Sequence, residues 1–175
     1  DGIVPEAIAA GQGVTLGANG DLYDDIMGED GVIAQVEEDG FMVSGHIAAL
    51  NLRAKLRGLR DLQGQPLFMR TMQAATAYEL DGVPVEFPRN GAIDPAEALL
   101  VSGDFTQLVY SIRQDVTYKL LDQAVIMNAD KTIQFNLPQQ DMVALRVVMR
   151  LGWQVPNPLN NVNTNAGTRY PFAVL

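Results

Sequence analysis

Two long stretches of alternating apolar and polar residues constrain the fold of this 175-residue chain more than any other feature. Between 108 and 120 the even positions are almost all apolar, and between 143 and 155 the odd positions are apolar. Alternation with a period of two predicts strands with one apolar face. At about thirteen residues, each exceeds the usual strand length of about 5–6 residues and would span about 40 Å. The rest of so small a chain cannot cover two such strands, so we expect the pair to project from a smaller domain.

The preceding segments predict short helices and strands. Helical spacing over 21–38, with acids in its first turn, predicts a helix, and Gly28 and Gly31 leave open whether it is one helix or two. Alternation over 41–49 predicts a strand, and the leucine spacing over 49–60 predicts an amphipathic helix with a basic outer face. That basic face could meet the acidic helix within the molecule or on a neighbour.

A hairpin is predicted around Asp81-Gly82, a dipeptide that favours a two-residue turn between strands at 78–80 and 83–87. Pro84 cannot donate to a sheet, which predicts that its strand lies at an edge. Loops are expected elsewhere, and the apolar end of the chain is expected to dock back on the core after a polar linker. The loop-like segments are 1–20, with a short strand near 14–16; 61–77; 88–98, before a buried strand at 99–101; and 122–141, with a strand at 132–137.

The composition leaves little material for catalysis. The sequence has no Cys and one His, which removes disulfide scaffolds, thiolate nucleophiles and Cys-ligated zinc. His46 has no partner in register and is expected to be a hydrogen-bonded structural residue on the strand face opposite the apolar one. Gly11-Gln12-Gly13 resembles the start of a dinucleotide fingerprint but lacks the preceding strand and the third glycine spacing. We therefore predict no enzyme activity, no cofactor and no metal.

The charge is strongly acidic, with 21 Asp and Glu against 12 Lys and Arg and a net charge of −9. Such a surface repels phosphate backbones, which argues against sequence-specific nucleic-acid binding. No stretch approaches the roughly 20 apolar residues of a membrane helix, so no membrane partner is expected. Eight of the acids lie between 21 and 39. The spacing of a calcium loop is absent there, which favours a solvated helix face over a cation site.

Four sets of residues, taken in order and spacing, carry a resemblance to a known family. They are Gly82-Val83-Pro84-Val85; an apolar strand leading into Gly103-Asp104-Phe105; Ile112-Arg113-Gln114-Asp115-Val116; and Asp141-Met142-Val143-Ala144-Leu145-Arg146 with Arg150-Leu151-Gly152. Together they resemble the C-terminal part of a tailed-bacteriophage or prophage major capsid protein, over roughly residues 20 to 158. The resemblance implies an α+β fold of the Hong Kong 97-like type.

The resemblance also implies a domain organisation. Residues 12–106 would form the core of an axial domain, a mixed sheet flanked by short helices. Residues 107–155 would form a long antiparallel strand pair extending into a peripheral domain, and residues 156–175 a tail docking back on the core. The family's N-terminal arm, extended loop and spine helix have no counterpart here, so a fragment of a longer protein is expected.

The implied function is structural. A capsid subunit of this family assembles with itself into pentamers and hexamers of an icosahedral head enclosing double-stranded DNA, in the virion and, during assembly, in the host cytoplasm. Its further partners would be a portal and a scaffold or maturation protease. Two alternatives stay open: a related encapsulin-like shell that stores protein cargo, which the neighbouring genes would distinguish, and a carboxylate-based hydrolase using a pair such as Asp104 and Asp141.

Candidate interaction residues lie on the long strands. The candidate contacts between subunits are Arg113, Asp115, Arg146 and Arg150. The three arginines could form ion pairs with Asp115 or with a neighbour's acids, and simple solvated positions remain the alternative. Some family members join subunits by a Lys–Asn isopeptide bond promoted by an acid, and Asn136 and Asp141 lie near the matching segment. A turn role for Asn136 and a solvated or paired Asp141 are favoured over that chemistry.

Overall fold

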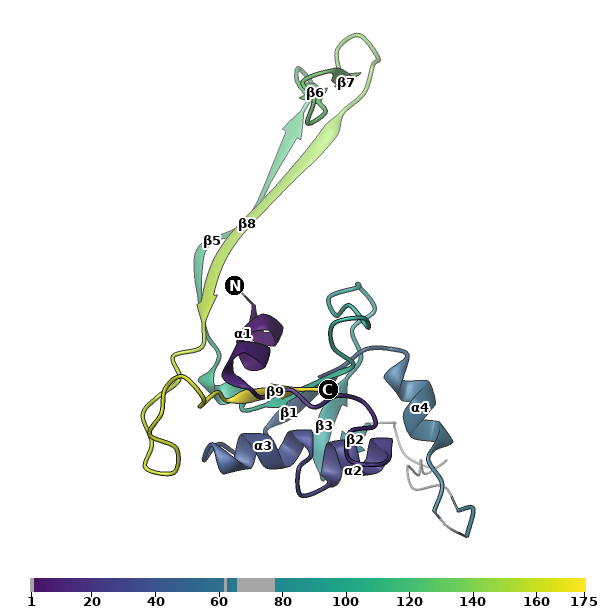
Figure 1. Cartoon of the computed structure of the whole chain (residues 1–175). Helices are drawn as coiled ribbons and strands as arrows, with labels where there is room; N and C mark the ends of the chain where they lie inside the picture. Colours follow the sequence, from purple (N-terminus) through teal and green to yellow (C-terminus); the bar gives the residue numbers. More distant parts are fainter. Residues whose placement is uncertain (1, 62, 66–77) are drawn as a thin grey trace. The chain divides into compact units, whose positions relative to one another are not determined.

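The computed structural model describes residues 2–61, 63–65 and 78–175. The chain forms two compact units (Figure 1). One, the sheet unit, comprises Asp1–Leu108 and Val155–Leu175, and the other, the strand-pair unit, comprises Val109–Gln154. The α+β fold class predicted from the sequence is confirmed.

The sheet unit contains a five-stranded sheet in the order β2-β3-β1-β4-β9. Its strands are β1 (Gly45–Ala48), β2 (Glu79–Leu80), β3 (Val83–Glu86), β4 (Leu100–Gly103) and β9 (Phe172–Val174). Strands β1 and β3 pair in parallel, and the other neighbours pair antiparallel, so the sheet is mixed as predicted. The C-terminal segment supplies β9, which pairs with β4 and is fully buried.

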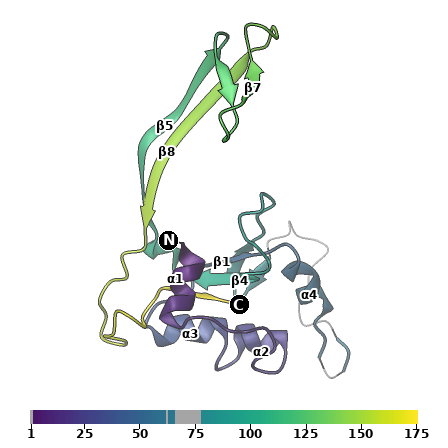
Figure 2. The ribbon, with the colours of Figure 1, turned by 45° about the horizontal axis from the view of Figure 1, so that its top comes forward.

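Short helices cover both faces of this sheet. They are α1 (Ile3–Ala10), α2 (Leu22–Met27), α3 (Val32–Glu38) and α4 (Leu52–Gly58), with a 3₁₀ turn η1 (Phe105–Gln107) after β4. Helix α1 lies over one face, and α2 and α3 lie over the other (Figures 1 and 2). Two buried clusters follow from this arrangement, because successive residues of a strand point to opposite faces. In β4, Leu100 joins the cluster beneath α2, α3 and α4, whereas Val101 joins the cluster beneath α1.

Glycines lie at the helix boundaries in the first forty residues. The acidic segment forms two helices, because Gly28 leaves the helix with an extended ψ of 172° and Gly31 begins the next one. The loop predicted for the first twenty residues is wrong over α1. Pro5 suits the first turn of a helix, and Gly11, with a φ of 86°, ends the helix in the left-handed conformation that glycine adopts without strain.

The hairpin forms as predicted, with positive φ at Asp81 and Gly82, but the edge position predicted for Pro84 is wrong. Strand β3 lies between β2 and β1, and β2 is the outer strand. Backbone groups of successive strand residues point to alternate neighbours. The amide of Val85 donates to the Tyr78 carbonyl at 2.7 Å, so the backbone nitrogen of Pro84 faces β1. No donor is needed there, because the pairing of β3 with β1 begins only at Val85.

The strand-pair unit is a long antiparallel pair of β5 (Val109–Leu121) and β8 (Ala144–Gln154). The alternation predicted the two strands, and the family resemblance implied their antiparallel pairing. Between them, β6 (Val125–Met127) and β7 (Ile133–Asn136) form a second hairpin. The short strand predicted at 132–137 is β7, whereas β6 lies in a segment predicted to be loop. Its residues Val125, Ile126 and Met127 are all exposed, so no burial pattern marks them in the sequence.

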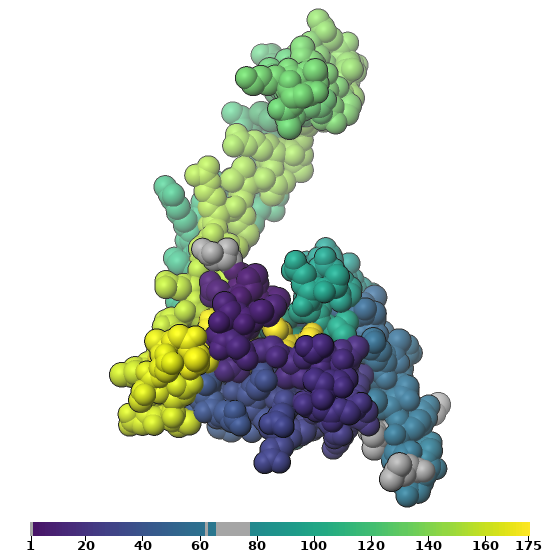
Figure 3. Space-filling model, in the orientation of Figure 1, coloured from purple at the N-terminus to yellow at the C-terminus, as the bar shows by residue number. Residues whose placement is uncertain are grey.

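The segment between β8 and β9 is held by a polar network around a buried carboxylate. Asp39 is 4% exposed and accepts hydrogen bonds from Gln12 Nε2 at 2.7 Å, Asn163 Nδ2 at 2.7 Å and the Tyr170 amide at 2.8 Å. The equally buried Arg169 donates to Asn157 Oδ1 and to the Asn163 carbonyl. Figure 3 shows this segment, in yellow, packed beside α3.

Candidate assembly surface

One face of the strand-pair unit carries a ladder of exposed apolar side chains, which we call the apolar face. Residues directly opposite on antiparallel strands share a face. Four such pairs lie on the apolar face: Tyr110 with Trp153, Ile112 with Leu151, Tyr118 with Val147, and Leu120 with Leu145. Their exposed fractions run from 43% at Trp153 to 71% at Leu120. A continuous exposed apolar surface of this kind is typical of an interaction site.

The opposite face carries a group of cations, and we call it the cationic face. Lys119 lies directly opposite Arg146, and Gln114 lies opposite Arg150. Thr117 and Val148 complete the pairing between them, and the six side chains line one shallow depression. The Thr117 hydroxyl donates to the Val148 carbonyl at 3.3 Å and accepts from Gln114 Nε2 at 3.2 Å, which ties the two strands together here.

Two irregularities in β5 determine which side chains reach the cationic face. Five steps of β5, from Ile112 to Thr117, are matched by only three steps of β8, from Leu151 to Val148. The two extra residues form bulges. Gln114 therefore shares a face with Thr117, although its even number places it with the apolar residues in the simple alternation. Because the number of extra residues is even, Tyr118 and Leu120 return to the apolar face.

The structure brings two of the four predicted interaction residues together on the cationic face. Arg146 and Arg150 lie there, whereas Arg113 and Asp115 lie in the bulged stretch of β5. The Asp115 carboxylate accepts a hydrogen bond from the neighbouring Val116 amide at 2.7 Å. Within the residues that the structure describes, none of the four takes part in an ion pair. The ion pair with Asp115 is therefore not formed in this chain.

Sequence reasoning did not single out Lys119 as an interaction residue. It occupies an exposed position of β5, but only the strand register places it opposite Arg146. The usable signal was the recurrence of basic residues at polar positions in both long strands.

Asn136 is the last residue of β7, and Asp141 lies in the turn that follows. The Asn136 carbonyl accepts from the Gln140 amide at 3.0 Å, and the Asn136 amide donates to Gln140 Oε1 at 3.2 Å. Asp141 is exposed and has a φ of 50°. The turn role favoured for Asn136 agrees with these contacts. Nearby, hydrogen bonds from the Thr132 hydroxyl and amide lower the pKa of Asp130.

The carboxylates proposed for the hydrolase alternative belong to different units, Asp104 to the sheet unit and Asp141 to the strand-pair unit. Asp104 caps η1, accepting from the Thr106 amide at 3.0 Å and from its hydroxyl at 2.6 Å. Its carboxylate is thus engaged in local structure.

The acids of residues 21–39 divide into two groups. Asp25 and Asp39 are buried, and Asp25 accepts from the Gly17 amide at 2.6 Å and the Asn19 amide at 3.0 Å. The other six are exposed, as expected for a solvated helix face: Asp21, Asp24, Glu29, Asp30, Glu37 and Glu38. Asp21 also caps α2 through the Tyr23 and Asp24 amides, as its position predicted.

Gly11-Gln12-Gly13 follows helix α1 rather than a strand, and Gln12 bonds Asp39, so the context of a dinucleotide site is missing. Across residues 2–61, 63–65 and 78–175, no group of three or more His, Cys, Asp or Glu side chains could hold a metal ion. The helices of this same part of the chain are too short or too polar to span a bilayer.

His46 lies in β1 and is buried, at 1% exposed, where the sequence predicted the exposed face of a strand. The sheet is covered on both faces, so alternation does not identify a solvent side. Its Nδ1 lies 2.8 Å from the Ser102 hydroxyl on β4, which agrees with a hydrogen-bonded structural role. Burial lowers the pKa of His46, and the nearby Leu80 carbonyl and Asp81 charge offset this only in part.

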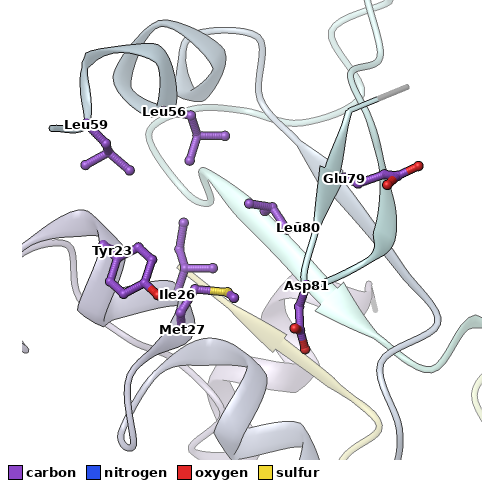
Figure 4. Close-up of a pocket in the computed structure, with 8 residues that line it drawn as sticks. All are labelled: Tyr23, Ile26, Met27, Leu56, Leu59, Glu79, Leu80 and Asp81. Carbon is purple, nitrogen blue, oxygen red and sulfur yellow. The ribbon is translucent and has the colours of Figure 1, made fainter. Parts of the chain in front are cut away.

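A small apolar hollow lies between α2, α4 and β2 (Figure 4). Tyr23, Ile26 and Met27 line it from α2, and Leu56 faces them from α4. The charged groups at its rim are Glu79 and Asp81. Among the described residues that line it, the remaining side chains are apolar apart from the Tyr23 hydroxyl.

These features define a protein whose long strand pair presents extended, exposed sheet faces. The chain matches the model of the Phage capsid family over residues 1–160. The major capsid protein of Staphylococcus phage 80alpha is 31% identical over 125 residues, which make up 70% of this chain and 36% of that relative.

Solved structures show the same likeness. A chain from Microbacterium phage Oxtober96 is 35% identical with a TM-score of 0.77, covering 99% of this chain and 53% of that chain. A chain from Mycobacterium phage Cain is 29% identical with a TM-score of 0.74, covering 100% of this chain and 54% of that chain. The present chain thus spans about half the length of these solved relatives.

The chain belongs to the Phage capsid family. It is a homologue of a major capsid protein, and its fold is the Hong Kong 97-like capsid fold that the sequence resemblance implied.

Proposed function

We propose that the protein is a shell subunit that assembles with copies of itself into pentamers and hexamers of an icosahedral phage head around double-stranded DNA. The apolar face of the strand-pair unit carries this proposal. Four cross-strand apolar pairs are exposed to water on the two long strands. Covering this surface by association with another subunit would lower the free energy of the system. Membership of the Phage capsid family supports a shell as the covering structure.

Within that subunit, residues 12–106 would form the axial domain, residues 107–155 the strand pair of the peripheral domain, and residues 156–175 a tail on the axial core. The division of the chain near Leu108 and Val155 supports the limits of the strand pair. Arg113, Asp115, Arg146 and Arg150 would lie at contacts between subunits, because no residue of the described chain pairs with them in an ion pair.

The location would be the virion capsid, reached after assembly in the host cytoplasm, with a portal and a scaffold or maturation protease as further partners. The proposal assigns no catalysis and no cofactor. The phage origin of the relatives favours a head that encloses DNA over an encapsulin-like compartment for protein cargo. Neighbouring genes for a portal, protease and terminase would support the phage head, and a gene for an oxidative enzyme would favour the compartment.

Electron microscopy of the complete product of the gene that encodes these residues tests the proposal. We expect closed particles. Replacing both Leu120 and Leu145 by Glu should abolish them, because charge would interrupt the apolar face. The matched control is Met42→Glu with Leu159→Glu, at apolar positions of the sheet unit that are 80% and 78% exposed. A wild-type product that remains a discrete small species under all assembly conditions would show that the protein is not a shell subunit.

A further inference from the structure

We propose that the cationic face of the strand-pair unit binds the exposed carboxylates of residues 29–38 on a second copy of this chain. The inference rests on the proposed self-assembly and names the surfaces that meet. The cationic surface consists of Lys119, Arg146 and Arg150. The acidic surface consists of Glu29 and Asp30, before helix α3, and Glu37 and Glu38, at its end.

The cationic face has like charges in direct opposition. Lys119 and Arg146 are cross-strand partners, an arrangement that destabilises a sheet by itself. Arg150 lies four residues from Arg146 on the same face, which places the two about 13 Å apart along the strand. Among the residues that the structure describes, no carboxylate forms an ion pair with any of the three. A partner that supplies carboxylates would remove the repulsion and satisfy all three cations.

The charge of the chain is divided unequally between its units. Residues 109–154 hold five Lys or Arg and four Asp, a net charge of +1, although the whole chain carries −9. The remaining residues therefore carry −10. When many copies gather, repulsion between their acidic sheet units is reduced if the cationic face of one copy meets acids of another.

The carboxylates around α3 match the cationic face in sign and spacing. Glu29 and Asp30 precede the helix, and Glu37 and Glu38 end it, and all four are exposed. The last turn has no basic residue. Carboxylates there repel the negative end of the helix dipole, so an external cation is favoured. The helix separates the two acidic pairs by on the order of 11 Å, close to the separation of Arg146 and Arg150.

Carboxylates of a second copy fit this face better than nucleic-acid phosphates. A duplex approaching the strand pair would also meet a chain of net charge −9. Phosphate binding normally shows as a dense surplus of basic residues, whereas the surplus in this unit is one charge. A second copy offers its exposed carboxylates as two small groups, at Glu29 and Asp30 and at Glu37 and Glu38, whereas the phosphates of a duplex form a continuous row of negative charge.

Zero-length cross-linking of mixed isotopes tests the contact. Natural and ¹⁵N-labelled copies of the 175-residue chain are mixed, treated with a carbodiimide that joins a Lys amine to a carboxylate, and analysed by mass spectrometry. The sequence has three lysines, Lys55, Lys119 and Lys131. We expect Lys119 to form mixed-isotope links to residues 29–38 at least tenfold more often than Lys131 does.

Charge reversal provides the second measurement. Arg146→Glu with Arg150→Glu should lower self-association, measured by sedimentation at low salt, at least tenfold. Adding Glu37→Lys and Glu38→Lys on the same chain should restore it, because both sides then exchange sign. Arg57→Glu with Arg89→Glu, two exposed positions of the sheet unit, is the matched control for net charge and should change association less than twofold.

Several results would overturn the inference. Lys119 links confined to one isotope would place the contact within a single chain. An equal loss of association in the Arg57 and Arg89 control would assign the effect to bulk charge. Binding of a DNA duplex with the same dependence on Arg146 and Arg150, without mixed-isotope links, would make the face a phosphate surface. Particles of the complete gene product that still form with Arg146→Glu and Arg150→Glu, together with absent links, would refute this contact while leaving the shell function intact.

Discussion

The sheet unit and the strand-pair unit differ in where their stability resides. In the sheet unit, every residue of β4 and β9 is buried. In the strand-pair unit, none of the residues of β5 and β8 is buried, although the two strands are much longer. Both pairs have complete antiparallel ladders over most of their length, so backbone hydrogen bonding does not explain the difference.

The comparison shows that long strands with a regular apolar alternation form in this chain without a buried core of their own. A two-stranded sheet without a packed face is marginal in water. The apolar alternation of β5 and β8 nevertheless extends over their whole length, which is the pattern of strands whose apolar face is covered. In this chain the cover is absent from the described residues, and in the proposed shell it comes with assembly.

The largest effect that would sharpen the comparison is the loss of an aromatic side chain from each unit. Phe172 is fully buried and its ring centroid lies 5.2 Å from that of Phe105 in an edge-to-face contact. Phe172→Ala should lower the free energy of unfolding by about 3–5 kcal/mol. Tyr118→Ala, at a 69% exposed position of β5, should cost less than about 1 kcal/mol.

Urea denaturation followed by circular dichroism measures both variants. Equal losses would contradict the division of stability between the units. Gly103 explains part of the sensitivity at Phe172, because a Cβ at that position would overlap the Phe172 ring and the Pro171 carbonyl. The close approach of β4 and β9 therefore depends on both residues.

The next largest effect concerns the polar network that holds the segment before β9. Asp39→Asn replaces one acceptor oxygen by an amide donor facing Gln12, Asn163 and the Tyr170 amide. We expect a loss of about 2–3 kcal/mol, because buried donors are left without partners. Glu38→Gln, at the adjacent exposed position, is the control and should change stability by less than about 0.5 kcal/mol. Comparable losses in both variants would show that the network does not hold the segment.

The sequence predicted best where one side of an element faces solvent. The alternation over 108–120 and 143–155 identified both long strands, because polar residues on one face of each strand are exposed to solvent. It failed at His46, where helices cover both faces of the sheet. The edge position predicted from Pro84 was wrong for a different reason. Strand order follows from pairings between distant segments, which the sequence of the hairpin does not reveal.

The candidate surface was predictable in part for a related reason. Arg146 and Arg150 were identified as exposed cations because β8 has a regular alternation. Their grouping with Lys119 was not predictable, since it depends on the register of β5 with β8 and on two extra residues in β5. Because the two extra residues of β5 are even in number, the alternation after the bulges is the same as before them. The sequence pattern therefore does not reveal the bulges.

A smaller and pH-dependent effect should be confined to the sheet unit. Burial lowers the pKa of His46 below its ordinary value of 6.5. The unfolded chain therefore takes up a proton at a higher pH than the folded chain does. Stability should be full above pH 6.5 and should fall as the pH drops from there toward the lowered folded pKa. His46→Gln should remove this dependence when thermal unfolding is measured between pH 7.5 and 5.5, whereas an unchanged slope would assign it to other groups.

The smallest expected effect is that of Lys119→Glu, which should stabilise the strand pair but weaken self-association. Lys119→Glu places a carboxylate opposite Arg146, which should stabilise the strand pair by about 0.2–1 kcal/mol by replacing repulsion with attraction. Hydrogen exchange of the β5 and β8 amides should slow accordingly. The same change removes a cation from the cationic face and should weaken self-association several-fold. Lys119→Gln separates the two causes, because it relieves repulsion without adding a carboxylate. If Lys119→Glu slowed exchange and strengthened association, the cationic face would not be an interface, and the strand pair would have to be understood as a poorly optimised element of the single chain.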